Sequence, residues 1–352
     1  MNQSLTLRVA RVVTVASMLV VAMAVPAVSA ASGPESRPTT RCDTSFDSYA
    51  VDASALSACG IGTSPLLGTA RLPDGGVSYR YRVNGTDVKA DVPPAGFNAA
   101  TADASTRARY GIPGRPVGAS PETVAAWTRM VSRLHFVTPA RALHTIPLRF
   151  STSVNFLNWS GFAAVGSGFT QAGAAYVEPT PGGCSGGSIG IWAGLGGISS
   201  SQLAQNGTAQ NAPGLGLDQA WYEILPSLPV AINFHASQGW LFEVMTSRFS
   251  GSFLFFFYNQ KTDDATTYSV TTSAYSGSSA EAIVERPKIG GGYTALENFG
   301  AMSVRGTANL NPIGNFTLDR ITMVNSSGVV LAKPGALAAD HETFTDTWKA
   351  CQ

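Results

Sequence analysis

Two glutamates near the end of the chain stand in a segment that could place them on one face of a strand. In Ala280–Arg286, Glu281 and Glu285 alternate with apolar residues, so both carboxylates point to the same side of an extended chain. Four residues separate them by ~13 Å, which is too far for two carboxyl groups that share a proton. By the same alternation, Trp221 and Glu223 share a face.

A second motif, Gly183-Cys184-Ser185-Gly186-Gly187, matches the G-x-S-x-G pattern of serine hydrolases. A nucleophile elbow needs a helix after the serine, whereas this loop leads into the apparent strand Ser188–Leu195. A serine mechanism also needs a histidine partner. None of the histidines stands in a recognisable motif; they are His135, His144, His235 and His341. The sequence therefore does not favour serine chemistry.

The composition indicates a β-rich protein, and the motifs of the common cofactor sites are missing. Charged residues make up 13% of the 352-residue chain, against ~25% in an average soluble protein, and 37 glycines favour strands and turns over long surface helices. No phosphate loop, paired-histidine motif or basic aromatic stripe is found, so we expect no nucleotide, metal, other cofactor or nucleic acid.

The N-terminus has the pattern of a signal peptide, residues 1–30. Arg8 and Arg11 precede the apolar run Val12–Ala24, and Val28-Ser29-Ala30 gives a small-x-small cleavage site. The run is shorter than the ~20 residues that a membrane span needs. We therefore expect a secreted protein that has no membrane attachment after cleavage.

All four cysteines follow the predicted signal: Cys42, Cys59, Cys184 and Cys351. An even number in an exported chain indicates two disulfides, for which three pairings exist. The pairing of Cys42 with Cys59 and of Cys184 with Cys351 would close two regions of the chain separately. The sequence leaves the three alternatives open.

Those two regions differ in charge. Residues 31–150 hold 13 Lys+Arg against 9 Asp+Glu, and residues 151–352 hold 8 against 13. Opposite net charges favour docking of one region on the other. In the first, Ser120-Pro121 is a typical helix start, and Ala102–Tyr110 is a second helix candidate. We interpret residues 31–150 as a mixed N-terminal region that acts as a propeptide; a permanent domain is the alternative.

The second region consists of short runs separated by turn residues, which predicts an antiparallel sandwich or barrel. The candidate strands are Trp159–Val165, Thr170–Glu178, Ser188–Leu195, Gln219–Leu225, Trp240–Thr246, Phe253–Asn259, Thr267–Thr272, Ala280–Arg286, Phe299–Arg305, Leu318–Val324 and Thr343–Trp348.

Five segments of this region, taken in order, resemble the glutamic peptidase family, also called eqolisins. They are Asn158–Gly161, Trp192–Gly197, Leu203–Gly207, Trp221–Glu223 and Ala280–Glu285. The resemblance covers about residues 155–350. It implies an all-β fold, an antiparallel β-sandwich of the concanavalin-like or jelly-roll type, with a substrate cleft on its concave face. Ahead of this sandwich we expect the smaller mixed N-terminal region.

The resemblance also implies the site residues. The family's catalytic glutamine falls on Gln205 and its catalytic glutamate on Glu285. Further family positions that line the cleft fall on Trp159, Trp192, Trp221 and Glu223. The chemistry fits amide hydrolysis, because a carboxylate can take a proton from water and a side-chain amide can donate to the developing oxyanion.

Two departures from the family pattern put specificity and acid optimum in question: Gly196 stands where the family has Asp, and Leu225 where it has an aromatic residue. Three functions remain open. The first is a monomeric acid endopeptidase acting on proteins and peptides, the second an inactive sandwich that binds protein or polysaccharide. The third is a glycoside hydrolase using Glu223 and Glu285, whose carboxyls would need a separation of ~5–9.5 Å.

Overall fold

The computed structural model describes residues 62–116, 121–146, 156–180, 182–198, 200–210, 219–273, 275, 277–289 and 291–352. The chain divides into two units, Met1–Thr40 and Arg41–Gln352, and every described residue belongs to the second. The predicted signal peptide and the cysteines at 42 and 59 lie outside the described residues. Within the described ranges, no helix is long and apolar enough to cross a bilayer.

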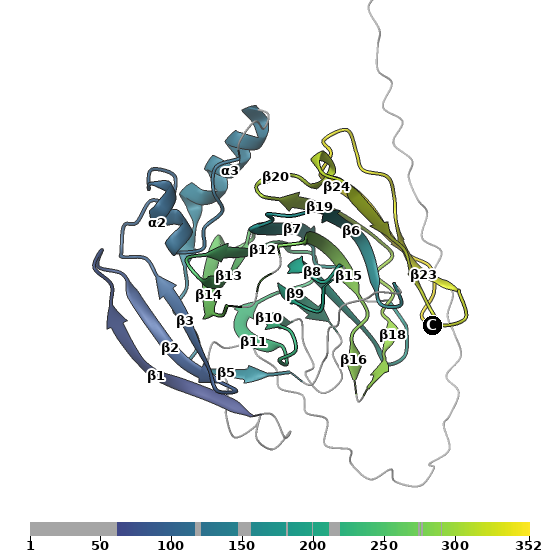
Figure 1. Ribbon diagram of the computed structural model, residues 1–352, viewed down its shortest axis with the longest axis horizontal. Coiled ribbons are helices and arrows are strands. Elements are labelled where there is room, and N and C mark those ends of the chain that lie inside the picture. The colour runs from purple at the N-terminus through teal and green to yellow at the C-terminus, as the bar shows by residue number, and fades with distance from the viewer. Residues whose placement is uncertain are drawn as a thin grey trace, which may run out of the picture. The chain divides into compact units, whose positions relative to one another are not determined.

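Sheet A carries the predicted site (Figure 1). Its strands follow in the order β21-β6-β15-β8-β9-β10-β11-β5-β1, with every neighbouring pair antiparallel. Their bounds are β1 (Thr63–Arg71), β5 (Ala142–Thr145), β6 (Trp159–Val165), β8 (Gly187–Gly196), β9 (Leu203–Gln210), β10 (Gln219–Ile224), β11 (Val230–His235), β15 (Ser279–Glu285) and β21 (Leu318–Ile321).

Sheet B follows the order β22-β23-β24-β19-β7-β12-β13-β14-β3-β2-β1, also antiparallel. Its strands are β2 (Val77–Val83), β3 (Thr86–Val92), β7 (Gln171–Val177), β12 (Leu241–Phe249), β13 (Ser252–Asn259), β14 (Asp264–Thr271), β19 (Ala301–Ala308), β22 (Met323–Val324), β23 (Val330–Pro334) and β24 (Thr343–Trp348). Strand β1 therefore belongs to both sheets.

Short elements complete the structure. They are α2 (Ala104–Arg109), α3 (Pro121–Arg133), β4 (His135–Phe136), β16 (Lys288–Ile289), β17 (Gly292–Tyr293), β18 (Ala295–Leu296), β20 (Asn311–Pro312) and the 3-10 turn η1 (Ile313–Asn315). Two of the short strands run parallel to a neighbour, β4 to β14 and β18 to β8.

The core lies between the two sheets, because alternate residues of each strand face inwards. In β15, Ala280, Ala282 and Val284 join the main hydrophobic cluster, whereas Ile283 belongs to a second cluster on the opposite face of sheet A. The same alternation fills the sheet B side with Phe253 and Phe255 of β13. The predicted all-β antiparallel sandwich is confirmed.

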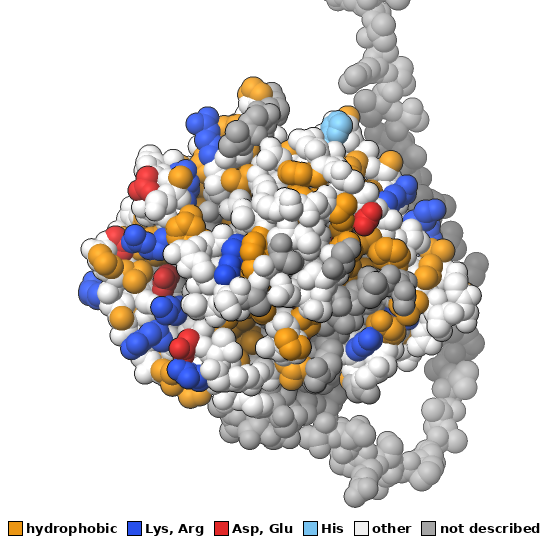
Figure 2. Space-filling view, viewed as in Figure 1, with side chains coloured by type: hydrophobic (Ala, Val, Ile, Leu, Met, Phe, Trp, Pro, Cys, Tyr) orange, Lys and Arg blue, Asp and Glu red, His pale blue; other side chains and the backbone are white. Residues whose placement is uncertain are grey.

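The N-terminal region is mixed, as predicted, but richer in strands. Both expected helices are present as α2 and α3, and the side chain of Asp103 caps α2 by accepting from the backbone N–H of Thr106 at 2.8 Å. Strands β1–β3 were not predicted. Lys and Arg side chains gather over these strands on the face shown in Figure 2, and the exposed ones include Arg71, Arg80, Arg82 and Lys89.

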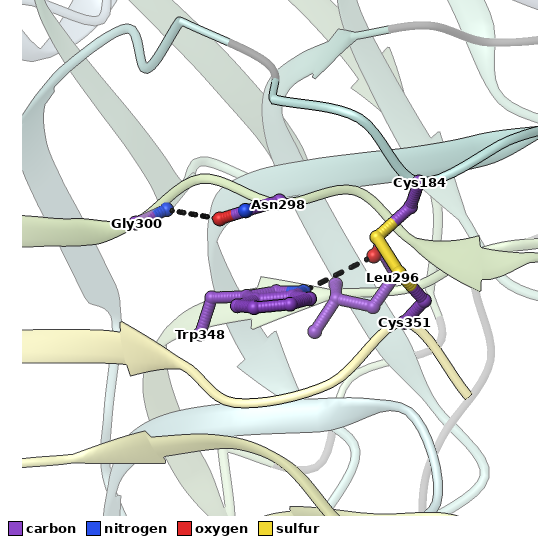
Figure 3. The surroundings of a disulfide bond; sticks show 6 residues. All are labelled: Cys184, Leu296, Asn298, Gly300, Trp348 and Cys351. Atoms are coloured by element: carbon purple, nitrogen blue, oxygen red, sulfur yellow. Dashed lines mark hydrogen bonds between the residues drawn. A yellow bond between two sulfur atoms is a disulfide. The ribbon is translucent and has the colours of Figure 1, made fainter.

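A disulfide joins Cys184 to Cys351, which confirms one bond of the pairing that would close each region separately. It ties the loop before β8 to the segment after β24 (Figure 3). Beside it, the backbone N–H of Leu296 donates to the carbonyl of Cys351, and the indole of Trp348 donates to the carbonyl of Leu296. The disulfide therefore stabilises the start of β8, the central strand of the predicted site, and the segments beside it.

Candidate functional site

The predicted site lies on the face of sheet A that points away from sheet B. Its floor is an apolar cluster built around three fully buried tryptophans, Trp159, Trp192 and Trp221. The register explains how they meet. Trp221 of β10 pairs with Gly207 of β9, and Gly207 pairs with Trp192 of β8. A glycine between two indoles leaves both rings room on one face.

Glu285 is held by two N–H donors. The indole Nε1 of Trp192 donates to Oε2 over 2.9 Å, and the amide Nδ2 of Asn158 donates to Oε1 over 2.5 Å. Trp159, the register partner of Glu285 on β6, meets Trp192 edge to face with ring centroids 4.9 Å apart. Hydrogen bonds of this kind favour the charged form of a carboxylate. Glu285 is thus buried and oriented by these two donors.

Gln205 is held from the other side. Its amide Nε2 donates to Oε2 of Glu223 over 2.6 Å, between residues that pair directly across β9 and β10. Oε1 of Gln205 has no hydrogen-bond partner among the described residues. The hydrogen bond from Nε2 to Glu223 turns the NH2 end of the Gln205 amide toward β10. The second hydrogen of this NH2 group remains for another acceptor.

Trp192 stands between the two predicted catalytic residues. Gln205 pairs with Gly194 of β8, while Glu285 pairs with Gly190 from the opposite side of the same strand. Position 192 is midway between these glycines. The two side chains therefore occupy diagonal corners around the indole, on the two strands that flank β8. In a flat sheet their Cα atoms would be roughly 16 Å apart, so a shared water requires both side chains to lean over Trp192.

The glycines around Trp192 are needed for space. A Cβ on Gly194 would lie 2.8 Å from the Trp192 ring and 3.0 Å from Leu203. A Cβ on Gly207 would lie 2.6 Å from Cβ of Trp192 and would collide with the carbonyl of Ile191. The Gly-rich pattern around Trp192 thus lets the indole lie flat along β8 and reach Glu285.

Strand β9 is fixed from the inter-sheet side. Asn206 donates through Nδ2 to the carbonyl of Phe256, and it accepts through Oδ1 from the hydroxyl of Thr246, both over 2.8 Å. The hydroxyls of Tyr176 and Thr208 lie 2.9 Å apart. These polar links between the sheets hold the strand that carries Gln205.

Glu281 is the remaining carboxyl on the site face. It stands level with Gln205, because both pair with Gly194. It is fully buried, and the Ser279 side chain and the backbone of Ile198 are the groups nearby that favour its charged form. Burial raises the pKa of this carboxyl well above its ordinary value. Burial therefore favours the neutral form of Glu281.

A hairpin follows Glu285 directly. Strands β16 and β17 pair between Lys288 and Tyr293, and the Tyr293 ring receives the Arg286 guanidinium at 4.8 Å and the Lys288 ammonium at 4.5 Å. Ile289 packs against the tryptophan cluster. The hairpin therefore adds an apolar contact and a pair of cations to the edge of the site.

The departures from the family pattern are visible in the structure. Gly196 ends β8 with a φ of 87° and pairs with Leu203, and Leu225 packs against the tryptophan cluster. The floor at these positions is thus apolar.

All predicted site residues are described, and each is at most 1% exposed. The structure brings Gln205 together with Glu223. It also brings Glu285 together with Trp192 and Trp159. Trp221 lies between these two groups, because its register partner Gly207 also pairs with Trp192. Asn158 was not predicted as a site residue. It precedes Trp159 in Asn158–Gly161, one of the five segments of the family resemblance. That position was the sequence signal that could have identified it. Among the described residues, no cluster of His, Cys, Asp or Glu could hold a metal ion.

Comparison with known proteins gives one family match. The model of the Peptidase A4 family matches residues 157–340. Among curated proteins, none matches the chain. Among solved structures, a scytalido-glutamic peptidase with a peptide-based transition-state analogue is 18% identical and covers 55% of this chain and 98% of its own, with a TM-score of 0.47. SCP-B, described as a member of the eqolisin family in complex with the tripeptide Ala-Ile-His, shows the same identity and coverage with a TM-score of 0.44.

Proposed function

Because the chain belongs to the Peptidase A4 family, and is thus a peptidase that acts on peptide substrates, we propose that it is a secreted acid endopeptidase of the glutamic type. Its catalytic pair is Gln205 and Glu285. The observation that carries the proposal is their arrangement: both are buried on one face of sheet A, at diagonal corners around Trp192, and each is oriented by its own hydrogen bonds.

Glu285 is the general base in this proposal. Its carboxylate takes a proton from a water molecule, the water oxygen attacks the scissile carbonyl carbon, and the same carboxyl passes the proton to the leaving amine. The Trp192 and Asn158 donors support this role because they keep the carboxylate charged before the reaction begins.

Gln205 is the oxyanion donor. An N–H of its amide points at the oxygen that gains negative charge when the carbonyl becomes tetrahedral, and one such donor stabilises the transition state by ~3 kcal/mol. The Glu223 hydrogen bond supports this role because it holds the amide in one orientation without using all of its hydrogens. Trp159, Trp192 and Trp221 form the floor beneath the substrate.

Acid dependence and secretion belong to the same proposal. A carboxyl group that must cycle its proton works best below neutral pH, since a model glutamate has a pKa of ~4.3. The disulfide supports an oxidising compartment. Because the site residues are almost fully buried, a peptide can reach them only after part of the protein moves or is removed. This burial supports a latent form that requires activation.

The two alternative functions gain less support. A glycoside hydrolase would use Glu223 and Glu285 as its pair, but Glu223 is engaged with Gln205 on the same face. An inactive binding module needs no oriented carboxylate, whereas Glu285 has two donors.

The test is protein digestion by the full chain across pH 2–7 in the presence of pepstatin, with Gln205→Ala and Gln202→Ala as a matched pair. Gln202 is an exposed amide three residues before Gln205. We expect wild type and Gln202→Ala to digest protein below neutral pH, and Gln205→Ala to lose about 10²–10³-fold in kcat. Activity that peaks at pH 8, or full activity of folded Gln205→Ala, would refute the proposal.

A further inference from the structure

The segment from Thr63 to Ile146, which the sequence places in a propeptide, adds strands to both sheets of the sandwich. On sheet B, β3 pairs with β14, where Ala90 faces Tyr268. On sheet A, β5 pairs with β11, where His144 faces Ala231. These backbone ladders continue the sheets of the peptidase and do not form a separate layer (Figure 1).

Strand β1 ties the two sheets together at this edge. Its first residues, Thr63–Pro65, pair with β5 of sheet A, and Leu66–Arg71 pair with β2 of sheet B, with a bulge between Leu66 and Gly68. The backbone N–H of Leu66 also donates to the carbonyl of Arg141 over 2.8 Å. A removable segment that merely covered a cleft would have no reason to join both sheets.

The segment also shares the main hydrophobic core. Tyr81, Val88 and Leu143 are at most 2% exposed and lie in the same cluster as Tyr222 and Tyr268 of the sandwich. The rings of Tyr81 and Tyr268 are 6.4 Å apart. Removing the segment would expose these apolar side chains to water, which disfavours its release.

Charge contributes little to this attachment. Arg133 pairs with Asp263 over 2.8 Å and His135 with Asp264 over 2.8 Å, but the side chains of Arg133 and His135 are more than half exposed. Exposed ion pairs of this kind contribute little to stability. Acid can weaken such pairs without affecting the strand ladders or the shared core, so low pH alone is not expected to release the segment.

Two residues of the segment reach the site face. His144 pairs with Ala231, and Ala231 pairs with Trp221, so all three lie in one row on the tryptophan side of sheet A. Ile146, two residues on, is fully buried in the tryptophan cluster, and its backbone N–H donates to the carbonyl of Pro229. Burial lowers the pKa of His144 to about 4, so this end of the site carries no charge above that pH.

We infer that residues 63–146 remain part of the working peptidase, and that His144 and Ile146 form an apolar end of its substrate-binding face. The role of these two side chains rests on the proposed function. The retention of the segment does not depend on it. Retention of residues 63–146 replaces the interpretation of all of residues 31–150 as a propeptide. An activating cleavage is then expected before Thr63, and the face formed by Trp221, His144 and Ile146 favours an apolar substrate side chain.

Retention is tested without any need for activity. The full chain is made with a site for a specific protease in place of residues 149–152, cut there, and passed over a gel-filtration column at pH 4 and at pH 7. We expect the two fragments to elute together at both pH values and to separate only in denaturant. Separation at pH 4 with the 151–352 fragment still folded by circular dichroism would overturn the inference.

The maturation product gives a second test of retention. The full chain is held at pH 3–4 until digestion of a protein substrate reaches its maximum, and the active species is identified by N-terminal sequencing and native mass. We expect it to contain residues 63–146. An active species that begins near residue 150 and lacks this segment would overturn the inference, while a wild type with no activity at any pH would instead refute the proposed function.

The role of the apolar end is tested with Ile146→Ala, using Ile146→Val as the conservative variant and Leu67→Ala as the matched control. Leu67 lies in β1 and is 62% exposed. For peptides with large apolar side chains, we expect Ile146→Ala to raise KM several-fold with little change in kcat, Ile146→Val to restore most of the affinity, and Leu67→Ala to behave as wild type. Wild-type KM in folded Ile146→Ala would show that this residue does not contact the substrate.

Discussion

Trp192 donates its indole N–H to Glu285 over 2.9 Å from the neighbouring strand of sheet A. The same ring lies over Gly194, the register partner of Gln205. One side chain therefore contacts the proposed base at one end and, at the other, lies over the glycine that pairs with the proposed oxyanion donor. A peptide bond bound above this indole would lie between the two groups that must act on it.

Replacing Trp192 by Phe removes the N–H donor and keeps an aromatic ring. A hydrogen bond to a charged group contributes ~1.5–3 kcal/mol, so we expect kcat/KM to fall by about 10–100-fold. The pH profile should also shift, because Glu285 loses a donor that favours its charged form. The measurement is kcat/KM against pH for a peptide substrate.

Trp348→Phe is the matched control. The Trp348 indole donates to the carbonyl of Leu296 beside the disulfide, away from Glu285. This variant should lose some stability and keep the wild-type pH profile. If both variants give the same profile, the Trp192 hydrogen bond has no role in catalysis.

Glu285 and Glu281 offer a second matched comparison, since they share a strand, a face and full burial. Glu285→Gln removes the proposed base, so we expect kcat to fall by about 10²–10⁴-fold. Glu281→Gln should keep most of the activity, because burial favours the neutral form of that carboxyl and an amide resembles a neutral carboxyl. The reverse outcome, an inactive but folded Glu281→Gln and an active Glu285→Gln, would assign the base to Glu281, level with Gln205 across Gly194.

Gly207 allows the close approach of β9 to Trp192. We expect Gly207→Ala to destabilise the fold by about 1–3 kcal/mol or more, because the added methyl meets the carbonyl of Ile191 and Cβ of Trp192. The measurement is urea unfolding of both variants. Gly292→Ala, in the hairpin after Glu285, is the control, since its Cβ would meet nothing within 4 Å. Equal stability of the two variants would contradict the packing described around Trp192.

Asp346 should make the protein more stable in acid. It is fully buried, accepts a hydrogen bond from Ser160 over 2.9 Å, and burial raises its pKa from 3.8 to about 7. The folded state thus holds a proton that the unfolded state has lost, so its contribution is complete below pH ~4 and is lost as pH rises to about 7. The loss is roughly 4 kcal/mol at most.

The unfolding temperature should accordingly fall between pH 4 and 7 and level off above. Asp346→Asn should remove much of this slope, whereas Asp87→Asn, whose side chain is 65% exposed, should leave it unchanged. Burial also raises the pKa of Glu243 and Glu281, so part of the slope remains in Asp346→Asn. A slope of the opposite sign in wild type would show that these carboxyls are not buried in solution.

Much of the sandwich was predictable because its strands carry a clear apolar pattern between turn residues. The predicted bounds of β6 and β24, Trp159–Val165 and Thr343–Trp348, agree with the structure. Strand β9 was missed because Gln205 faces the site while Asn206 and Thr208 face the sandwich interior, so both of its faces are polar. Its burial depends on partners in other strands, and no local pattern reveals them.

One of the N-terminal strands, β2, has a sequence pattern that could have predicted it. In β2, Tyr79, Tyr81 and Val83 alternate with Arg80 and Arg82, as expected of a half-buried strand. In the site, the shared face of Glu281, Ile283 and Glu285 followed from alternation alone. The Asn158 donor to Glu285 did not, because it depends on the register of β6 against β15, which is set by the packing of the whole sheet.

The double membership of β1 also has a consequence for solubility. A strand at the border of a sheet presents unpaired backbone groups that can recruit a strand from another molecule. Here β11 and β14 would be such borders, but β5 and β3 cover them, and β1 closes this side by pairing with β5 and with β2, the strand next to β3. We expect this side of the protein to resist strand-to-strand aggregation, and a chain shortened to begin after β5 to aggregate through the borders that it uncovers.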